Sequence, residues 1–161
     1  MTARASASRK KTAAAPATED TVDTRYLQTL IGYNARRAAL TIISLFVPRM
    51  ADFGLRPVDF SILSVIAHNP GITSKQLCKV LDLLPPNLVG KIDALERRGV
   101  LERRSHPSDG RALGLHLTPD GQELMRQAEK VAFELETEAA SALSADERKT
   151  LIHLLRKVYD R

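Results

Sequence analysis

The chain has 161 residues, of which 43% are hydrophobic, and it carries a formal net charge of +5 and one cysteine. This hydrophobic content supports a packed core and excludes wholesale disorder, and the lone Cys78 excludes an intramolecular disulfide framework. The basic balance favours polyanionic partners. The basic excess ends at Thr118, because residues 119–161 hold 7 Lys and Arg against 9 Asp and Glu.

The most apolar stretch, residues 38–47, contains Thr41 and Ser44 and is far shorter than the roughly 20 residues that cross a bilayer. No apolar run follows the basic residues near the N-terminus, so no secretory signal is indicated. We therefore expect a cytoplasmic protein with no membrane partner.

Residues 1–22 are rich in Ala, Ser, Thr, Pro and charged side chains and show no hydrophobic periodicity. This composition predicts a disordered basic tail. Contact between its basic cluster and DNA phosphates is an alternative, but a solvated tail is the simpler interpretation.

From about Asp23 to Met50, apolar residues recur every three or four positions, which predicts an amphipathic helix. The helix is expected to end before the Asp-Phe-Gly sequence at 52–54. Its predicted buried face consists of Leu27, Leu30, Ile31, Asn34, Ala38, Ile42 and Leu45.

Two further helices are predicted before residue 82. One is expected from Pro57 to Asn69, with Asp59 favouring its positive N-terminal end. Thr73 and Gln76 then have the spacing of a capping box, which predicts a helix over 74–81.

A fourth helix follows after a very short connection, as in a helix-turn-helix. Prolines at 85 and 86 are tolerated there, because amides in a helix's first turn have no intrahelical partner. Leu88, Ile92 and Leu95 form its predicted buried face, and Pro86, Asn87, Gly90, Lys91 and Ala94 form its predicted outward face. An ordinary surface helix with a polar face is the alternative.

A β-hairpin is predicted next. Leucines at 113, 115 and 117 alternate with Gly114 and His116, which indicates a half-buried strand, and Arg103 and Arg104 lie on or just after its partner. The loop 105–111 is polar and basic. Asp109 is expected to orient Arg111 outward, where a narrow and negative minor groove attracts a guanidinium.

Two helices complete the chain. Thr118 is the expected N-cap of the first, with Pro119 at its first position. Ser144 and Glu147 form a second capping box before the last helix. The predicted fold is mainly α, in the order four helices, hairpin, two helices.

The ordered set of motifs resembles the MarR family of winged helix-turn-helix transcription regulators. The motifs are the helix-turn-helix, Leu-Glu-Arg-Arg-Gly at 95–99, Asp-x-Arg-Ala at 109–112 and Leu-Thr-Pro-Asp-Gly at 117–121. The resemblance implies an intertwined homodimer, with residues 23–54 and 119–161 as its helical dimerisation region. It implies that residues 55–118 form a DNA-binding lobe, with recognition helices in major grooves and wings in minor grooves.

The resemblance also implies a set of contacts with a pseudo-palindromic DNA operator. Many family members have Ser or Thr at the start of the recognition helix and Arg near position 90, whereas this chain has Pro86, Asn87 and Gly90. Asn87 and Lys91 are therefore the predicted base readers. The expected DNA-binding residues are Thr73, Ser74, Pro86, Asn87, Gly90, Lys91, Arg103, Arg104, His106, Asp109 and Arg111.

Such regulators, often repressors, respond to small molecules, so the resemblance implies an effector such as an aromatic or phenolic acid or its CoA thioester. Polar residues near the apolar stripe of the first long helix are the available candidates for its site. They are Tyr33, Asn34, Arg37 and Thr41. The alternative is that Asn34 bonds within the chain and Arg37 is solvated.

Other functions lack supporting motifs in the sequence. The chain shows no Gly-rich phosphate loop, nucleophile elbow or metal triad, so neither an enzyme nor a cofactor is expected. Its four histidines lack the paired spacing of metal ligands. Cys78 is expected to pack as a small side chain rather than to sense redox state. An architectural DNA-binding protein without a ligand is the remaining alternative.

Overall fold

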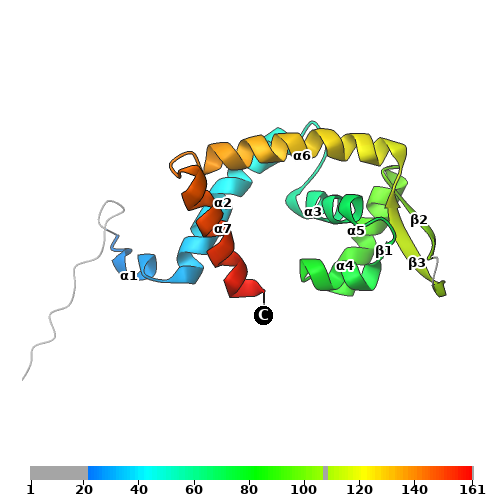
Figure 1. Ribbon diagram of the computed structural model, residues 1–161, viewed down its shortest axis with the longest axis horizontal. Coiled ribbons are helices and arrows are strands. Elements are labelled where there is room, and N and C mark those ends of the chain that lie inside the picture. Colours follow the sequence, from blue (N-terminus) through cyan, green and yellow to red (C-terminus); the bar gives the residue numbers. More distant parts are fainter. Residues whose placement is uncertain (1–21, 107–108, 161) are drawn as a thin grey trace, which may run out of the picture. The chain divides into compact units, whose positions relative to one another are not determined.

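The computed structural model describes residues 22–106 and 109–160, and the chain divides into two compact units, residues 1–37 and 38–161. Figure 1 shows the helices and strands in sequence colours. Each unit is described by itself.

The N-terminal unit holds a short helix, α1 (Arg25–Gln28), and the first turns of α2 (Ile31–Met50). We predicted one continuous helix, and the break after Gln28 is a correction. The amide nitrogen of Asn34 donates to the carbonyl oxygens of Gln28 and Leu30, at 2.8 Å each. These bonds satisfy carbonyls that the break leaves without intrahelical partners. Asn34 is exposed in the single chain rather than on a buried face.

The second unit contains the C-terminal part of α2 and all remaining elements. They are α3 (Pro57–His68), β1 (Ile72–Thr73), α4 (Ser74–Leu81), α5 (Pro85–Arg97), β2 (Leu101–His106), β3 (Asp109–Leu117), α6 (Pro119–Ala139) and α7 (Ala145–Tyr159). The prediction of a mainly helical fold with a hairpin is confirmed. None of the described helices is long and apolar enough to cross a membrane.

The predicted helix caps are confirmed. Thr73 forms a capping box with Gln76 at the start of α4, and Ser144 forms one with Glu147 at the start of α7. The hydrogen bonds from Ser144 hold the pKa of Glu147 below its ordinary value. Thr118 accepts from the amide of Gly121 at 3.1 Å and so caps α6.

The sheet has three antiparallel strands in the order β1-β3-β2. The hairpin of β2 and β3 was predicted, and Leu101 is paired with Leu117 at its base. The strand β1, which pairs Ile72 with Leu115, was missed. Two residues are too few to show the alternation that identifies a strand in a sequence.

One hydrophobic core joins α3, α4, α5, the sheet and α6. Figure 1 shows α3, α4 and α5 beside the hairpin. The core's fully buried members include Ile62, Leu63, Ile66, Leu77, Leu88, Ile92, Leu101, Leu115, Met125 and Leu135. Leu113 was predicted to be buried and is 52% exposed. Among the side chains of β3 that the structure describes, Leu115 and Leu117 near the hairpin's base are buried in the core.

The helix α7 leaves an apolar face uncovered in the single chain. Its apolar side chains fall at the predicted three- and four-residue spacings, but they do not join the core. They are Leu151, Ile152, Leu154, Leu155 and Val158, each at least 38% exposed.

Gly121 permits the closest approach to a neighbouring backbone among the glycines that the structure describes. A Cβ atom at this position would lie 2.0 Å from the carbonyl oxygen of Val100. Because no side chain fits this space, α6 can start against the end of the turn that precedes β2 only with glycine here.

We expect Gly121→Ala to lower the free energy of unfolding by about 1–3 kcal/mol, because the added methyl group forces the backbone apart. Urea unfolding at a fixed protein concentration measures the change. The control is Gly90→Ala, whose Cβ would meet nothing within 4 Å. It is expected to raise stability by about 0.5–1 kcal/mol. Equal stability of the two variants would contradict the packing argument.

Candidate nucleic-acid interface

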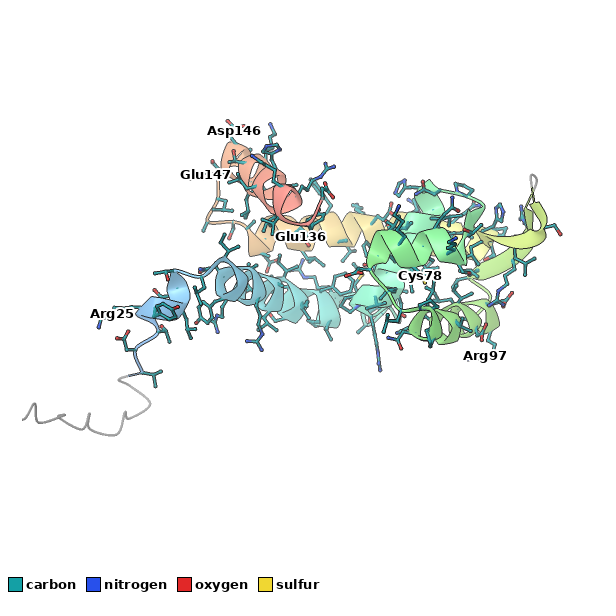
Figure 2. All side chains as sticks on the ribbon, turned by 90° about the horizontal axis from the view of Figure 1, so that it is seen from below. Arg25, Cys78, Arg97, Glu136, Asp146 and Glu147 are labelled. Carbon is teal, nitrogen blue, oxygen red and sulfur yellow. The ribbon has the colours of Figure 1, made fainter. Side chains whose placement is uncertain are left out.

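A tight turn joins α4 to α5. Asp82 has a left-handed backbone conformation (φ 50°), and its N–H bonds to the carbonyl of Cys78. The N–H of Leu83 bonds to the same carbonyl at 3.0 Å. These bonds end α4, and three residues separate it from the start of α5, as in a helix-turn-helix. The side chain of Cys78 is half-buried against the core, and Figure 2 shows it on α4.

The start of α5 is set by its two prolines. Pro85 and Pro86 have no N–H to donate, and the N–H groups of Asn87 and Leu88 both bond to the carbonyl of Leu84, at 3.0 and 3.2 Å. The first turn of this helix is therefore satisfied without a side-chain cap.

The two faces of α5 separate largely as predicted. Leu88, Ile92 and Leu95 are buried, and Pro86, Asn87, Gly90 and Ala94 are exposed. Val89 is also exposed, at 53%. The exposed face belongs to the N-terminal part of the helix and is available to a groove in DNA.

Lys91 does not share that outward face, which corrects the prediction. Its Nζ donates to Asp59 Oδ1 of α3 at 2.8 Å, and the two side chains are 35% and 16% exposed. A mostly buried carboxylate needs a partner, and Lys91 supplies it. The structure therefore directs this ammonium group toward α3.

Arg103 on β2 is also engaged within the chain. Its guanidinium donates to Asp93 Oδ1 at 2.6 Å and to Glu96, both on α5. The hydrogen bond with Asp93 raises the pKa of Arg103 above its ordinary value. This arginine joins the hairpin to the recognition helix. The neighbouring Arg104 is exposed and pairs with Glu102 of its own strand.

The Leu-Glu-Arg-Arg-Gly motif at 95–99 has a structural role that the sequence did not reveal. Arg98 donates to the carbonyl of Gly54 at 3.0 Å and to that of Phe53, in the segment between α2 and α3. Gly99 turns the chain with φ 76°. The motif thus ties the end of α5 to the segment between α2 and α3.

The predicted DNA contacts of Thr73, Ser74 and the hairpin tip remain predictions. Thr73 and Ser74 are half-buried at the start of α4, where the hydroxyl group of Thr73 is committed to the cap. The backbone register pairs His106 with Asp109. The side chains of His106, Asp109 and Arg111 lie outside the described residues.

A mainly apolar cleft of about 360 Å³ lies in the second unit, between α2, α3 and α6. Phe46 and Phe60 meet edge to face, with ring centroids 5.5 Å apart. The lining residues are Ile42, Ile43, Phe46, Pro57, Phe60, Ser61, Ala132, Phe133 and Glu136. None of these residues was predicted to line a binding site, because the sequence pattern does not distinguish Phe60 and Phe133 from ordinary apolar residues of amphipathic helices.

The predicted effector residues do not line this cleft. Tyr33, Asn34 and Arg37 belong to the N-terminal unit, and Thr41 is exposed on α2 beside Ile42 in the sequence. Their role in binding an effector remains a prediction. Across residues 22–106 and 109–160, no three His, Cys, Asp or Glu side chains gather as metal ligands.

The pair Arg103 and Arg104 gives a matched test of this site. We expect Arg103→Met to lower the free energy of unfolding by about 1–2 kcal/mol, because it leaves two partly buried carboxylates without their partner. We expect Arg104→Met to change stability by less than about 0.5 kcal/mol, since its ion pair is exposed. Urea unfolding of both variants measures the difference. Equal effects would refute the structural role of Arg103.

Comparisons with known proteins agree with this geometry. The sequence profile of the MarR family matches residues 53–112. The chain is 30% identical over 130 residues to a putative transcriptional regulatory protein for the hcr operon of Thauera aromatica. The match covers 80% of this chain and 78% of that protein.

Solved structures resemble the fold along most of the chain. The transcriptional repressor CouR bound to a 23-mer DNA duplex has a TM-score of 0.78 and 33% identity, covering 85% of this chain and 97% of that one. CouR bound to p-coumaroyl-CoA has a TM-score of 0.75 and 31% identity, covering 85% and 96%. Apo MarR from E. coli has a TM-score of 0.69 and 27% identity, covering 81% and 97%.

Proposed function

This chain belongs to the MarR family of transcription regulators, and we propose that it is a repressor that leaves its operator when an effector binds. In this proposal a homodimer grips a pseudo-palindromic DNA site. The observation that carries the proposal is the exposed N-terminal face of α5, presented by a helix-turn-helix and followed by a hairpin wing. The DNA complex of CouR supports it.

A second copy of the chain explains the uncovered apolar face of α7. Leu151, Leu154 and Val158 are 43–52% exposed, and contiguous apolar surface of this kind marks an interaction site. Two DNA-binding lobes in one dimer would contact two half-sites, which accounts for a pseudo-palindromic operator.

The variant Gly90→Ala tests whether this face of α5 enters a groove. The added methyl group meets nothing within the chain, so the variant is expected to fold and to gain stability. Its affinity for a selected operator is expected to fall several-fold, because the methyl group lies between the helix and the bases. Fluorescence anisotropy with a labelled duplex measures this. Unchanged affinity would place the groove contact elsewhere, and sequence-blind binding by the parent protein would favour an architectural role.

We propose that the effector is an aromatic acid in the form of its CoA thioester and that its acyl group occupies the apolar cleft. Three phenylalanines line the cleft, and its lining residues include one carboxylate, Glu136, and no cation. A free aromatic acid would bring a second negative charge near Glu136, whereas a thioester carbonyl is neutral. The complex of CouR with p-coumaroyl-CoA supports this choice.

Phe133→Ala tests the effector site with little risk to the fold, because Phe133 is 75% exposed. We expect p-coumaroyl-CoA to release the parent protein from its operator, free p-coumaric acid to act only at higher concentration, and the variant to need more of the thioester. Glu136→Gln should reduce the difference between the concentrations of free acid and thioester that release the protein from its operator. An equal response of parent and Phe133→Ala would exclude this cleft.

A further inference from the structure

The N-terminal end of α5 presents a neutral surface, because the cations nearest to it are engaged within the chain. The cation closest to Asn87 along the helix, Lys91, is bonded to Asp59 of α3. The cation of the adjoining strand, Arg103, is held by Asp93 and Glu96. Neither positive charge is presented with Asn87 on the exposed face.

The backbone of this helix end is also committed. A helix N-terminus ordinarily offers free N–H groups to a phosphate. Here Pro85 and Pro86 have none, and the N–H groups of Asn87 and Leu88 both bond to the carbonyl of Leu84. The first turn of α5 therefore has no amide left for a DNA phosphate.

One polar side chain remains on the exposed surface of this end. Asn87 is exposed, and its side-chain amide has no hydrogen-bond partner among the described residues. Pro86 and Gly90, four positions apart, lie along one outward line of the helix, with Asn87 and Val89 on its two sides. Leu84 before the helix is 69% exposed. The other exposed residues named at this helix end are apolar, except for Gly90, which has no side chain.

We propose that α5 reads A·T base pairs in the major groove, with Asn87 bonded to an adenine and apolar residues against thymine methyl groups. This inference rests on the proposed operator binding. An asparagine amide donates to N7 and accepts from the N6 amino group of adenine, and this pairing suits no other base equally. Pro86 and Val89 are placed to contact the C5-methyl groups of neighbouring thymines.

Guanine reading needs an arginine or lysine at the bases, because both guanine groups in the major groove are acceptors. Moving Lys91 to the bases would leave the mostly buried carboxylate of Asp59 without its partner, which is strongly unfavourable. Arg97 is exposed, but it follows Asn87 by ten residues, about 15 Å along the helix. Figure 2 shows Arg97 at the end of α5 next to the hairpin. It therefore cannot replace a cation beside Asn87.

The experiment begins with selection of duplexes from a random library by the full-length protein. We expect the selected half-sites to carry A·T pairs at adjacent positions. Replacing the contacted adenine with 7-deazaadenine removes N7 and should weaken binding about 5- to 150-fold. Replacing a neighbouring thymine with uracil removes the methyl group and should weaken binding several-fold.

Two variants assign the effects to residues. In Asn87→Ala the 7-deazaadenine duplex should bind as well as the unmodified duplex, because the partner of N7 is gone. Lys91→Met keeps the stem of the side chain without its charge and should keep the selected sequence. Both are assayed below their melting temperatures.

The outcomes separate this inference from the proposed function. Selection of half-sites with conserved G·C pairs, sensitive to 7-deazaguanine and relaxed in Lys91→Met, would overturn A·T reading while leaving operator binding intact. Failure of the parent protein to enrich any sequence would overturn both. Loss of 7-deazaadenine sensitivity in Asn87→Ala, with the sequence retained in Lys91→Met, would establish the inference.

Discussion

The recognition helix is fixed by charge pairs on both of its sides, and the DNA-binding surface depends on this arrangement. Arg103 reaches from the hairpin to two carboxylates on α5, and Lys91 reaches from α5 to Asp59 on α3. Hydrophobic packing of Leu88 and Ile92 alone sets the depth of the helix but restricts rotation about its axis less strictly. Ion pairs with partly buried partners are directional, so they define which face points outward.

This arrangement engages Lys91 and Arg103 in contacts within the chain. A net charge of +5 describes the whole chain, whereas the exposed start of α5 is neutral. Lys75 and Lys79 on α4 are exposed, so we expect contacts with the phosphate backbone to come from such cations outside α5. In our proposal, base reading and electrostatic attraction are therefore carried by different elements of the same lobe.

Features formed by residues close together in the sequence were predicted, whereas contacts between residues far apart in the chain were missed. The caps at Thr73, Thr118 and Ser144 were recognised because a cap involves residues three positions apart. The partner of Lys91 was not, because Asp59 lies 32 residues earlier in the chain. The aromatic cleft was missed for the same reason, since its lining residues come from three helices that also bury other apolar side chains. At the break near Thr29, the side-chain amide of Asn34 bonds to backbone carbonyls. The hydrophobic periodicity identifies Asn34 only as a polar residue among apolar ones and does not predict these bonds.

The contact between Gly121 and Val100 has a mechanical consequence. Thr118 donates to the carbonyl of Gly99 at 2.6 Å, and its N–H bonds to the carbonyl of Val100 at 3.3 Å. With the start of α6 pressed against the same carbonyl, this junction cannot act as a hinge. These contacts tie the first turn of α6 directly to the residues that precede and begin β2. The start of α6 and the root of the hairpin are therefore held together as one closely packed junction.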